Sequence, residues 1–125
     1  MANPDLIKNY TAGGTINPYR IVKFGSNDGE VVQGAAATDL LIGVVNIPAI
    51  AVTGNRVDVV RDGLVLVEFG GTVARGAVVT SDANGKAVAA APATGVNNRI
   101  IGYAEVSAVA GDIADILLEI GTLQG

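Results

Sequence analysis

The chain contains no cysteine, no histidine and no tryptophan among its 125 residues. The absence of cysteine excludes disulfides and thiolate nucleophiles, and the absence of histidine removes the usual near-neutral general base. Together the two absences exclude a zinc site built from Cys and His ligands. Aspartate and glutamate remain as acids, bases or ligands of hard cations. We therefore predict no catalytic residue, no bound cofactor and no metal site, and a protein that is not an enzyme.

Positive charge is also scarce. Eight Lys and Arg residues stand against twelve Asp and Glu residues, which gives a net charge of −4. A protein that neutralises phosphates needs a basic face, so we expect no nucleic-acid partner. The longest apolar run, residues 40–52, is interrupted by Asn46 and Pro48 and is too short to cross a bilayer. Residues 1–9 lack the pattern of a secretory signal. We expect no membrane partner and synthesis as a soluble cytosolic chain.

Aromatic residues make up only 4% of the chain, although half of its residues are apolar. The core must therefore consist of Val, Ile, Leu and Ala. Seventeen glycines among β-branched residues indicate many short strands joined by tight turns. We predict an all-β fold, a small β-barrel or sandwich of short strands with two similar halves and an extended N-terminal arm. The expected strands are about 20–25, 30–34, 40–46, 56–61, 64–69, 76–80, 86–90, 99–106 and 113–120.

The chain repeats one pattern. Residues 20–32 and 76–88 each consist of an apolar run, an Asx-Gly turn and a second apolar run, and Asp28-Gly29 and Asn84-Gly85 are strong hairpin signals. The alignment pairs Val22 with Val78, Gly29 with Gly85, and Val32 with Val88. It continues in order with 41–43 and 100–102, 49–51 and 108–110, and 54–59 and 111–116. This order predicts a duplication.

The duplication settles two further expectations. Residues 112–120 fit a helical face and a strand face equally well, but their partner, residues 56–61, is too short and too β-rich for a helix. Both segments are therefore predicted to be strands. Residues 1–19, rich in Asn, Pro and Gly, have no counterpart in this alignment, and we expect an extended arm that serves binding and not folding. The alternative is a frayed terminus. The predicted domain covers 20–125, with repeat halves at about 20–63 and 76–121.

The segment Gly63–Gly71 is almost continuously apolar, which indicates that both of its faces are covered. One cover would be the barrel interior and the other a neighbouring subunit. Together with the large apolar residues of the arm, this predicts an interface. Its residues are Leu6, Ile7, Tyr10, Leu64, Val65, Leu66, Val67 and Phe69.

Three polar motifs have a plausible chemical interpretation and a more economical structural one. Asp58 and Asp115 occupy equivalent repeat positions, as a carboxylate pair would, but each also fits the outward residue of an alternating strand. Residues 81–85 (Ser-Asp-Ala-Asn-Gly) resemble a calcium loop, but the further ligands are missing and a hairpin turn explains them better. Lys86 follows this turn as a carrier lysine would, without the flanking residues of lipoyl or biotin carriers.

Two stretches of the sequence resemble a known family: residues 70–90, GGTVARGAVVTSDANGKAVAA, and residues 99–112, RIIGYAEVSAVAGD, continuing to Leu118. The family that they resemble is the capsid decoration (cement) proteins of tailed bacteriophages. The resemblance covers roughly residues 20–121 and brings no catalytic residues with it. It implies a β-rich virion protein, often a homotrimer, that binds the major capsid protein on the outer capsid surface. There it would stabilise the shell against internal DNA pressure. The alternative is a carbohydrate-binding or carrier-type β module.

Overall fold

The computed structural model describes residues 3–125, and side-chain exposure from Leu6 onward. Within these residues the chain forms nine strands and no helix, which confirms the all-β prediction. Within residues 3–125 there is therefore no helix that could span a membrane. The strands are β1 (Asn3–Ala12), β2 (Arg20–Phe24), β3 (Glu30–Gln33), β4 (Leu41–Val45), β5 (Arg56–Glu68), β6 (Val78–Ser81), β7 (Ala87–Ala89), β8 (Asn97–Ala104) and β9 (Ile113–Gln124).

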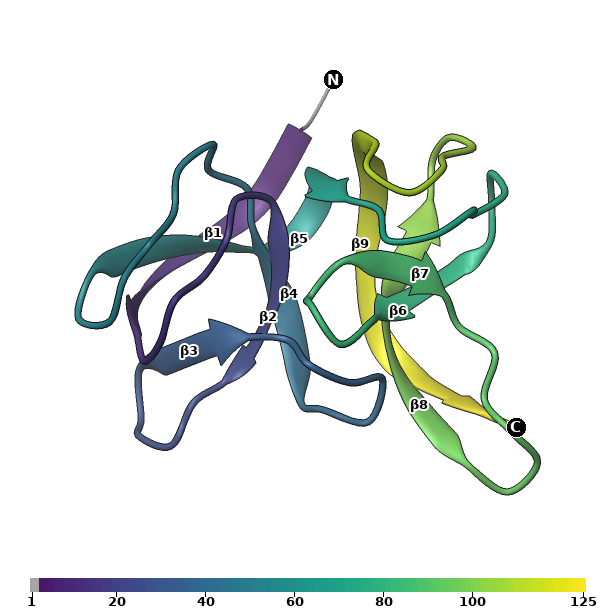
Figure 1. The fold of residues 1–125 in the computed structure, drawn as a ribbon, viewed down its shortest axis with the longest axis horizontal. Helices are drawn as coiled ribbons and strands as arrows, with labels where there is room; N and C mark the ends of the chain where they lie inside the picture. The colour runs from purple at the N-terminus through teal and green to yellow at the C-terminus, as the bar shows by residue number, and fades with distance from the viewer. Residues whose placement is uncertain (1–2) are drawn as a thin grey trace.

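The strands form two modules that share β5 (Figure 1). In the sheet order β1-β3-β2-β4-β5-β9-β8-β6-β7, the additional pairing of β1 with β5 closes the first five strands into a barrel. We call residues 3–62 the N-terminal module and residues 63–125 the C-terminal module. In the C-terminal module the second half of β5 pairs with β9, and a parallel bridge from Phe69 to Ala87 brings β7 back to the end of β5.

Corresponding strands pair in corresponding registers, which supports the predicted duplication. Val22 on β2 faces Gly43 on β4, and Val79 on β6 faces Gly102 on β8. The loop before each module's last strand also repeats, because Asn55 accepts a bond from the Val52 amide as Asp112 does from the Val109 amide.

These pairings correct the predicted alignment at two places. Val22 corresponds to Val79 and not to Val78, because the first Asx-Gly turn is one residue longer than the second. Ala51 corresponds to Ala108, since Ile16 bridges to Ala51 as Val73 bridges to Ala108. The pairs Gly29 with Gly85 and Ile42 with Ile101 stand as predicted.

The prediction of an arm outside the domain is wrong. The segment is extended, but residues 3–11 pair antiparallel with β5, and Thr11 and Ala12 pair parallel with β3. Tyr10, Ala12 and Ile16 are buried. The physical reason is that β1 supplies the strand that closes the first barrel, just as the second half of β5 does for the second. The folded domain therefore includes β1 and does not begin at Arg20. The two halves are the modules 3–62 and 63–125, in place of the predicted 20–63 and 76–121.

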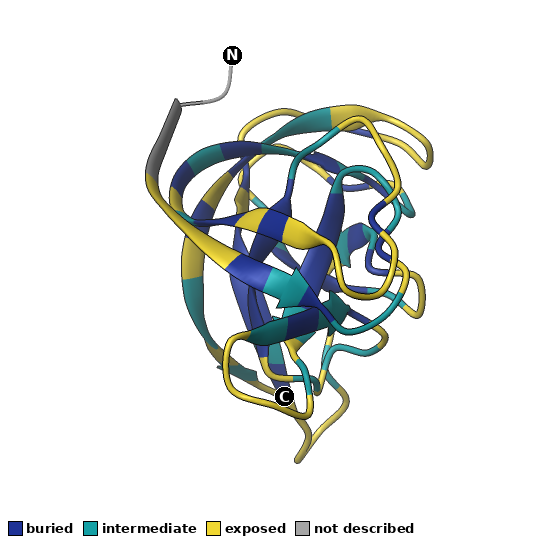
Figure 2. Cartoon of the chain, turned by 90° about the vertical axis from the view of Figure 1, so that its left-hand side faces the viewer, coloured by how far each residue is buried: buried dark blue, intermediate teal, exposed yellow. Residues whose placement is uncertain are grey.

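Two hydrophobic cores fill the molecule, and residues alternate between buried and exposed along the strands around them (Figure 2). One core lies inside the N-terminal module and includes Tyr10, Ile16 and Ile42. The other fills the C-terminal module around Phe69 and Ile116. Corresponding positions line both interiors.

The second core also takes in the outer face of the N-terminal module. Ile21, Leu41, Val44 and Val60 belong to this core and are at most 1% exposed. Hydrogen bonds follow the same contact: the Ile21 amide donates to Gly85 (2.8 Å) and the Arg99 amide donates to Ala37 (2.7 Å). The two modules are therefore one folded unit, joined by a sheet face as well as by β5.

Burial within the former arm can be tested with one residue type. Ile16→Ala should lower the free energy of unfolding by about 2–5 kcal/mol, because it leaves a cavity in the first core. Ile7→Ala is the matched control, since Ile7 is 50% exposed and its truncation should cost far less. Urea denaturation followed by circular dichroism measures both. If both variants lowered the free energy of unfolding by the same small amount, this segment would not be part of the core.

A second test concerns Gly43, where the backbones of β4 and β5 approach each other closely. A Cβ on Gly43 would collide with the backbone oxygen of Val60, so Gly43→Ala should destabilise the fold by about 1–3 kcal/mol or more. Gly14→Ala is the control, because the nearest atom to its added Cβ would be a Val32 methyl at 3.9 Å. A thermal melt of the two variants that showed the same midpoint would contradict this interpretation.

Candidate interaction surfaces

The two equivalent aspartates hold no shared site. Asp58 lies on the outer face of β5 and accepts a bond from the Asn9 amide group (3.0 Å), while Asp115 lies half-buried on β9. Among residues whose side chains are described, no three His, Cys, Asp or Glu residues gather as metal ligands would. Each aspartate serves as the outward residue of its strand.

The calcium-like loop is a hairpin turn. Asp82 turns its carboxylate inward to the turn and accepts the backbone amides of Asn84 (2.8 Å) and Lys86 (2.9 Å). Gly85 has a φ of 72°, which the Asx-Gly signal requires. The carboxylate is therefore used in shaping the backbone.

Lys86 does not project as a carrier lysine must. Its ammonium lies 3.1 Å from Glu68, and the other oxygen of Glu68 lies 2.8 Å from Arg20. Arg20 also donates to the backbone oxygens of Pro18 and Asn84. The three charges therefore tie the β6–β7 turn to the start of β2, across the boundary between the modules.

Glu68 is ionised at lower pH than an ordinary glutamate. Partial burial raises its pKa, but hydrogen bonds from Lys86 and Arg20, with their positive charges, outweigh that effect and hold the pKa below its usual value of 4.5. Asp39 follows the same pattern, with burial opposed by the Ala35 amide and by Lys23. Both carboxylates stabilise the fold when charged.

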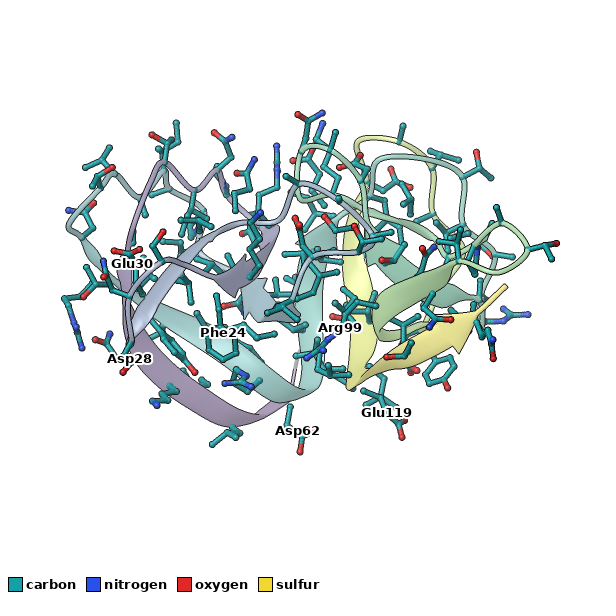
Figure 3. The ribbon with its side chains drawn as sticks, turned by 90° about the horizontal axis from the view of Figure 1, so that it is seen from below. Phe24, Asp28, Glu30, Asp62, Arg99 and Glu119 are labelled. Carbon is teal, nitrogen blue, oxygen red and sulfur yellow. The ribbon has the colours of Figure 1, made fainter. Side chains whose placement is uncertain are left out.

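The aromatic residues form no platform for a sugar. Tyr10 is buried and its hydroxyl accepts a bond from Arg61 (2.6 Å). Phe69 is fully buried, whereas Tyr103 on β8 is exposed. Phe24 is 44% exposed and lies at the end of the N-terminal module seen in Figure 3, with the Arg61 guanidinium 5.8 Å from its ring centre.

The predicted interface residues divide into three groups. Leu6 and Ile7 are exposed at the start of β1. Leu64 and Leu66 are half-buried on the outer face of β5. The remaining four are core residues and are wrong as interface residues, because they point into the chain's own barrels: Tyr10, Val65, Val67 and Phe69.

Other large apolar residues are exposed besides the predicted interface residues. Phe24 and Leu40 lie together, since the Phe24 amide donates to the Leu40 carbonyl. Tyr103 and Leu117 face each other across β8 and β9. Val109 borders a pocket whose other walls are Thr72, Val73, Ala74, Ser107, Ala108 and Asp112. The repeat could have indicated the first two pairs, because the residues at the equivalent positions of the other module lie in the contact between the modules.

The topology, with two modules that share a strand, can be compared with known proteins. No family model matches the chain, and no curated protein matches its sequence. A solved structure does match. The fold is similar to that of the head fiber gp8.5 N base of bacteriophage phi29. The TM-score is 0.70 at 19% identity, and the match covers 96% of this chain and 98% of the phage chain. At this identity the likeness to the head fiber base establishes the fold, and membership of the decoration-protein family stays a prediction.

Glu68 provides a test with a defined pH dependence. Because its folded pKa is lowered, its contribution is fully present above the unfolded value near 4.5 and is lost as pH falls through the folded pKa. Glu68→Gln should therefore cost on the order of 1 kcal/mol at pH 7, with the gap closing below about pH 4.5. Urea titrations between pH 3 and pH 7 measure the gap. A stability difference between the wild type and Glu68→Gln that does not change with pH would contradict a stabilising role of the Glu68 charge.

Proposed function

We propose that this chain is a structural component of a bacteriophage virion. The observation that carries the proposal is the similarity to the phi29 head fiber N base, which extends over nearly the whole of both chains. The sequence resemblance to phage decoration proteins leads to the same class of protein independently. The use of each candidate polar group in turns, strands and ion pairs of the fold is consistent with a role without chemistry.

The proposed partner is the major capsid protein, contacted from outside the mature shell, with the bound protein stabilising that shell against DNA pressure. A homotrimer is the proposed form on the capsid. Leu6 and Ile7 support contact with another protein, because two adjacent large apolar side chains, 55% and 50% exposed, stand on an ordered strand. An ordered strand loses little conformational entropy when it binds.

Co-sedimentation with mature capsids that lack this protein tests the proposal. The wild-type chain should pellet with capsids and not with naked DNA. Leu6→Asp should weaken capsid binding about tenfold, because half-burying a leucine contributes roughly 1–1.5 kcal/mol and an introduced charge must also be desolvated.

Val96→Asp is the control for this experiment, since Val96 lies exposed in the loop before β8, away from β1. It should bind as the wild type does. A chain that never pellets with capsids refutes the virion role, and equal binding by both variants refutes only the contact at Leu6.

A further inference from the structure

A row of outward residues runs across four strands of the N-terminal module. Ile21 on β2 pairs with Val44 on β4, Val44 pairs with Val60 on β5, and Val60 pairs with Ile7 on β1. The C-terminal module covers the first three, which lie in its core. Within this chain, one module's outer row is thus a docking site for the other module.

The same row exists in the C-terminal module. Val78 on β6 pairs with Tyr103 on β8, Tyr103 pairs with Leu117 on β9, and Leu117 pairs with Leu64 on β5. Position by position these residues correspond to Ile21, Val44, Val60 and Ile7. This row is more exposed than the first, because Tyr103 is 36% and Leu117 is 37% exposed, while Val78 and Leu64 are half-buried. We call it the open row.

The surface that covers the first row belongs to one end of the C-terminal module. The β6–β7 turn reaches β2 there, where Gly85 accepts the Ile21 amide and Asn84 accepts a bond from Arg20. Arg99, between the modules in Figure 3, donates to the carbonyls of Ala37 and Leu41. A Cβ on Gly34 would lie 2.9 Å from the Ser81 hydroxyl, which shows how closely β6 approaches.

The N-terminal module has the equivalent end, and its large apolar side chains are exposed. Phe24 occupies the place of Ser81, Leu40 the place of Arg99, and the Asp28-Gly29 turn the place of Asn84-Gly85. Where the internal contact uses a serine and an arginine, this end presents a phenylalanine and a leucine, 44% and 60% exposed. We call it the Phe24 end.

We propose that the Phe24 end of one copy docks on the open row of a second copy, repeating between chains the contact that joins the two modules within a chain. The occupant is therefore this chain itself. Large exposed apolar side chains on both surfaces are the residue types that anchor protein interfaces, and an unpartnered sheet face of this kind needs a cover.

Such a contact is heterologous, because it joins two different surfaces of the same chain. Repetition of a heterologous contact gives a closed ring or an open chain of copies, not a two-fold dimer. The inference concerns self-association in solution. It rests on the proposed function in no step and holds whether or not the protein binds a capsid.

The test uses sedimentation velocity on the full chain at increasing concentration. Wild-type protein should form species larger than the monomer. Leu117→Asp removes the open row and Phe24→Asp removes the Phe24 end, and each variant alone should be monomeric. Mixed together they should form a one-to-one complex, since each variant keeps the surface that the other has lost. Ile50→Asp, at an exposed loop residue outside both surfaces, should behave as the wild type.

Each result decides the proposal. Wild type that stays monomeric at several hundred micromolar, variants that associate like the wild type, or a mixture that stays monomeric would each overturn it. Circular dichroism melts check that the variants fold, and Leu117→Ser with Phe24→Ser replaces the pair if the aspartates do not fold. Capsid co-sedimentation in parallel separates this outcome from the proposed function.

Discussion

The close approach of backbone to backbone at one glycine in each module sets the geometry on which the fold depends. Gly43 on β4 faces the carbonyl oxygen of Val60, and Gly102 on β8 faces the carbonyl oxygen of Leu117 at the equivalent position. No side chain fits at either place. Because strands come this close only without a Cβ, each module curls tightly enough for its first strand to meet its last, and a small aliphatic interior suffices to fill it.

The shared strand β5 makes the duplication asymmetric. Each module needs five strand segments, but residues 3–125 build two modules from nine strands because β5 ends the first and begins the second. The second module is therefore placed against the outer row of the first, and no further element within residues 3–125 is placed against the outer row of the second. The same strand pairing in both modules thus gives a buried outer row in the N-terminal module and an exposed one in the C-terminal module.

Eight of the nine strands in residues 3–125 were predicted from apolar runs and Asx-Gly turns, although the predicted strands 56–61 and 64–69 are one strand, β5. The repeat resolved residues 113–120 correctly as a strand. The first strand was missed because Pro4, Gly13-Gly14 and Pro18 resemble a loop when considered alone. A second copy of the signal was present, since Gly13-Gly14-Thr15-Ile16 recurs as Gly70-Gly71-Thr72-Val73 at the end of β5. Val65, Val67 and Phe69 were misplaced for a different reason. A continuous apolar run shows that two faces are covered, but it does not show whether the cover belongs to the same chain.

Sharing one strand also determines how the molecule bears load. A force that draws the modules apart acts along the covalent backbone of β5, which is held by β1 through residues 56–64 and by β9 through residues 63–68. Because the two ladders overlap at Gly63 and Leu64, no point along β5 is held by covalent bonds alone. Separation would require many hydrogen bonds to yield together in shear, and not one after another. We therefore expect the two modules to resist separation as one stiff unit.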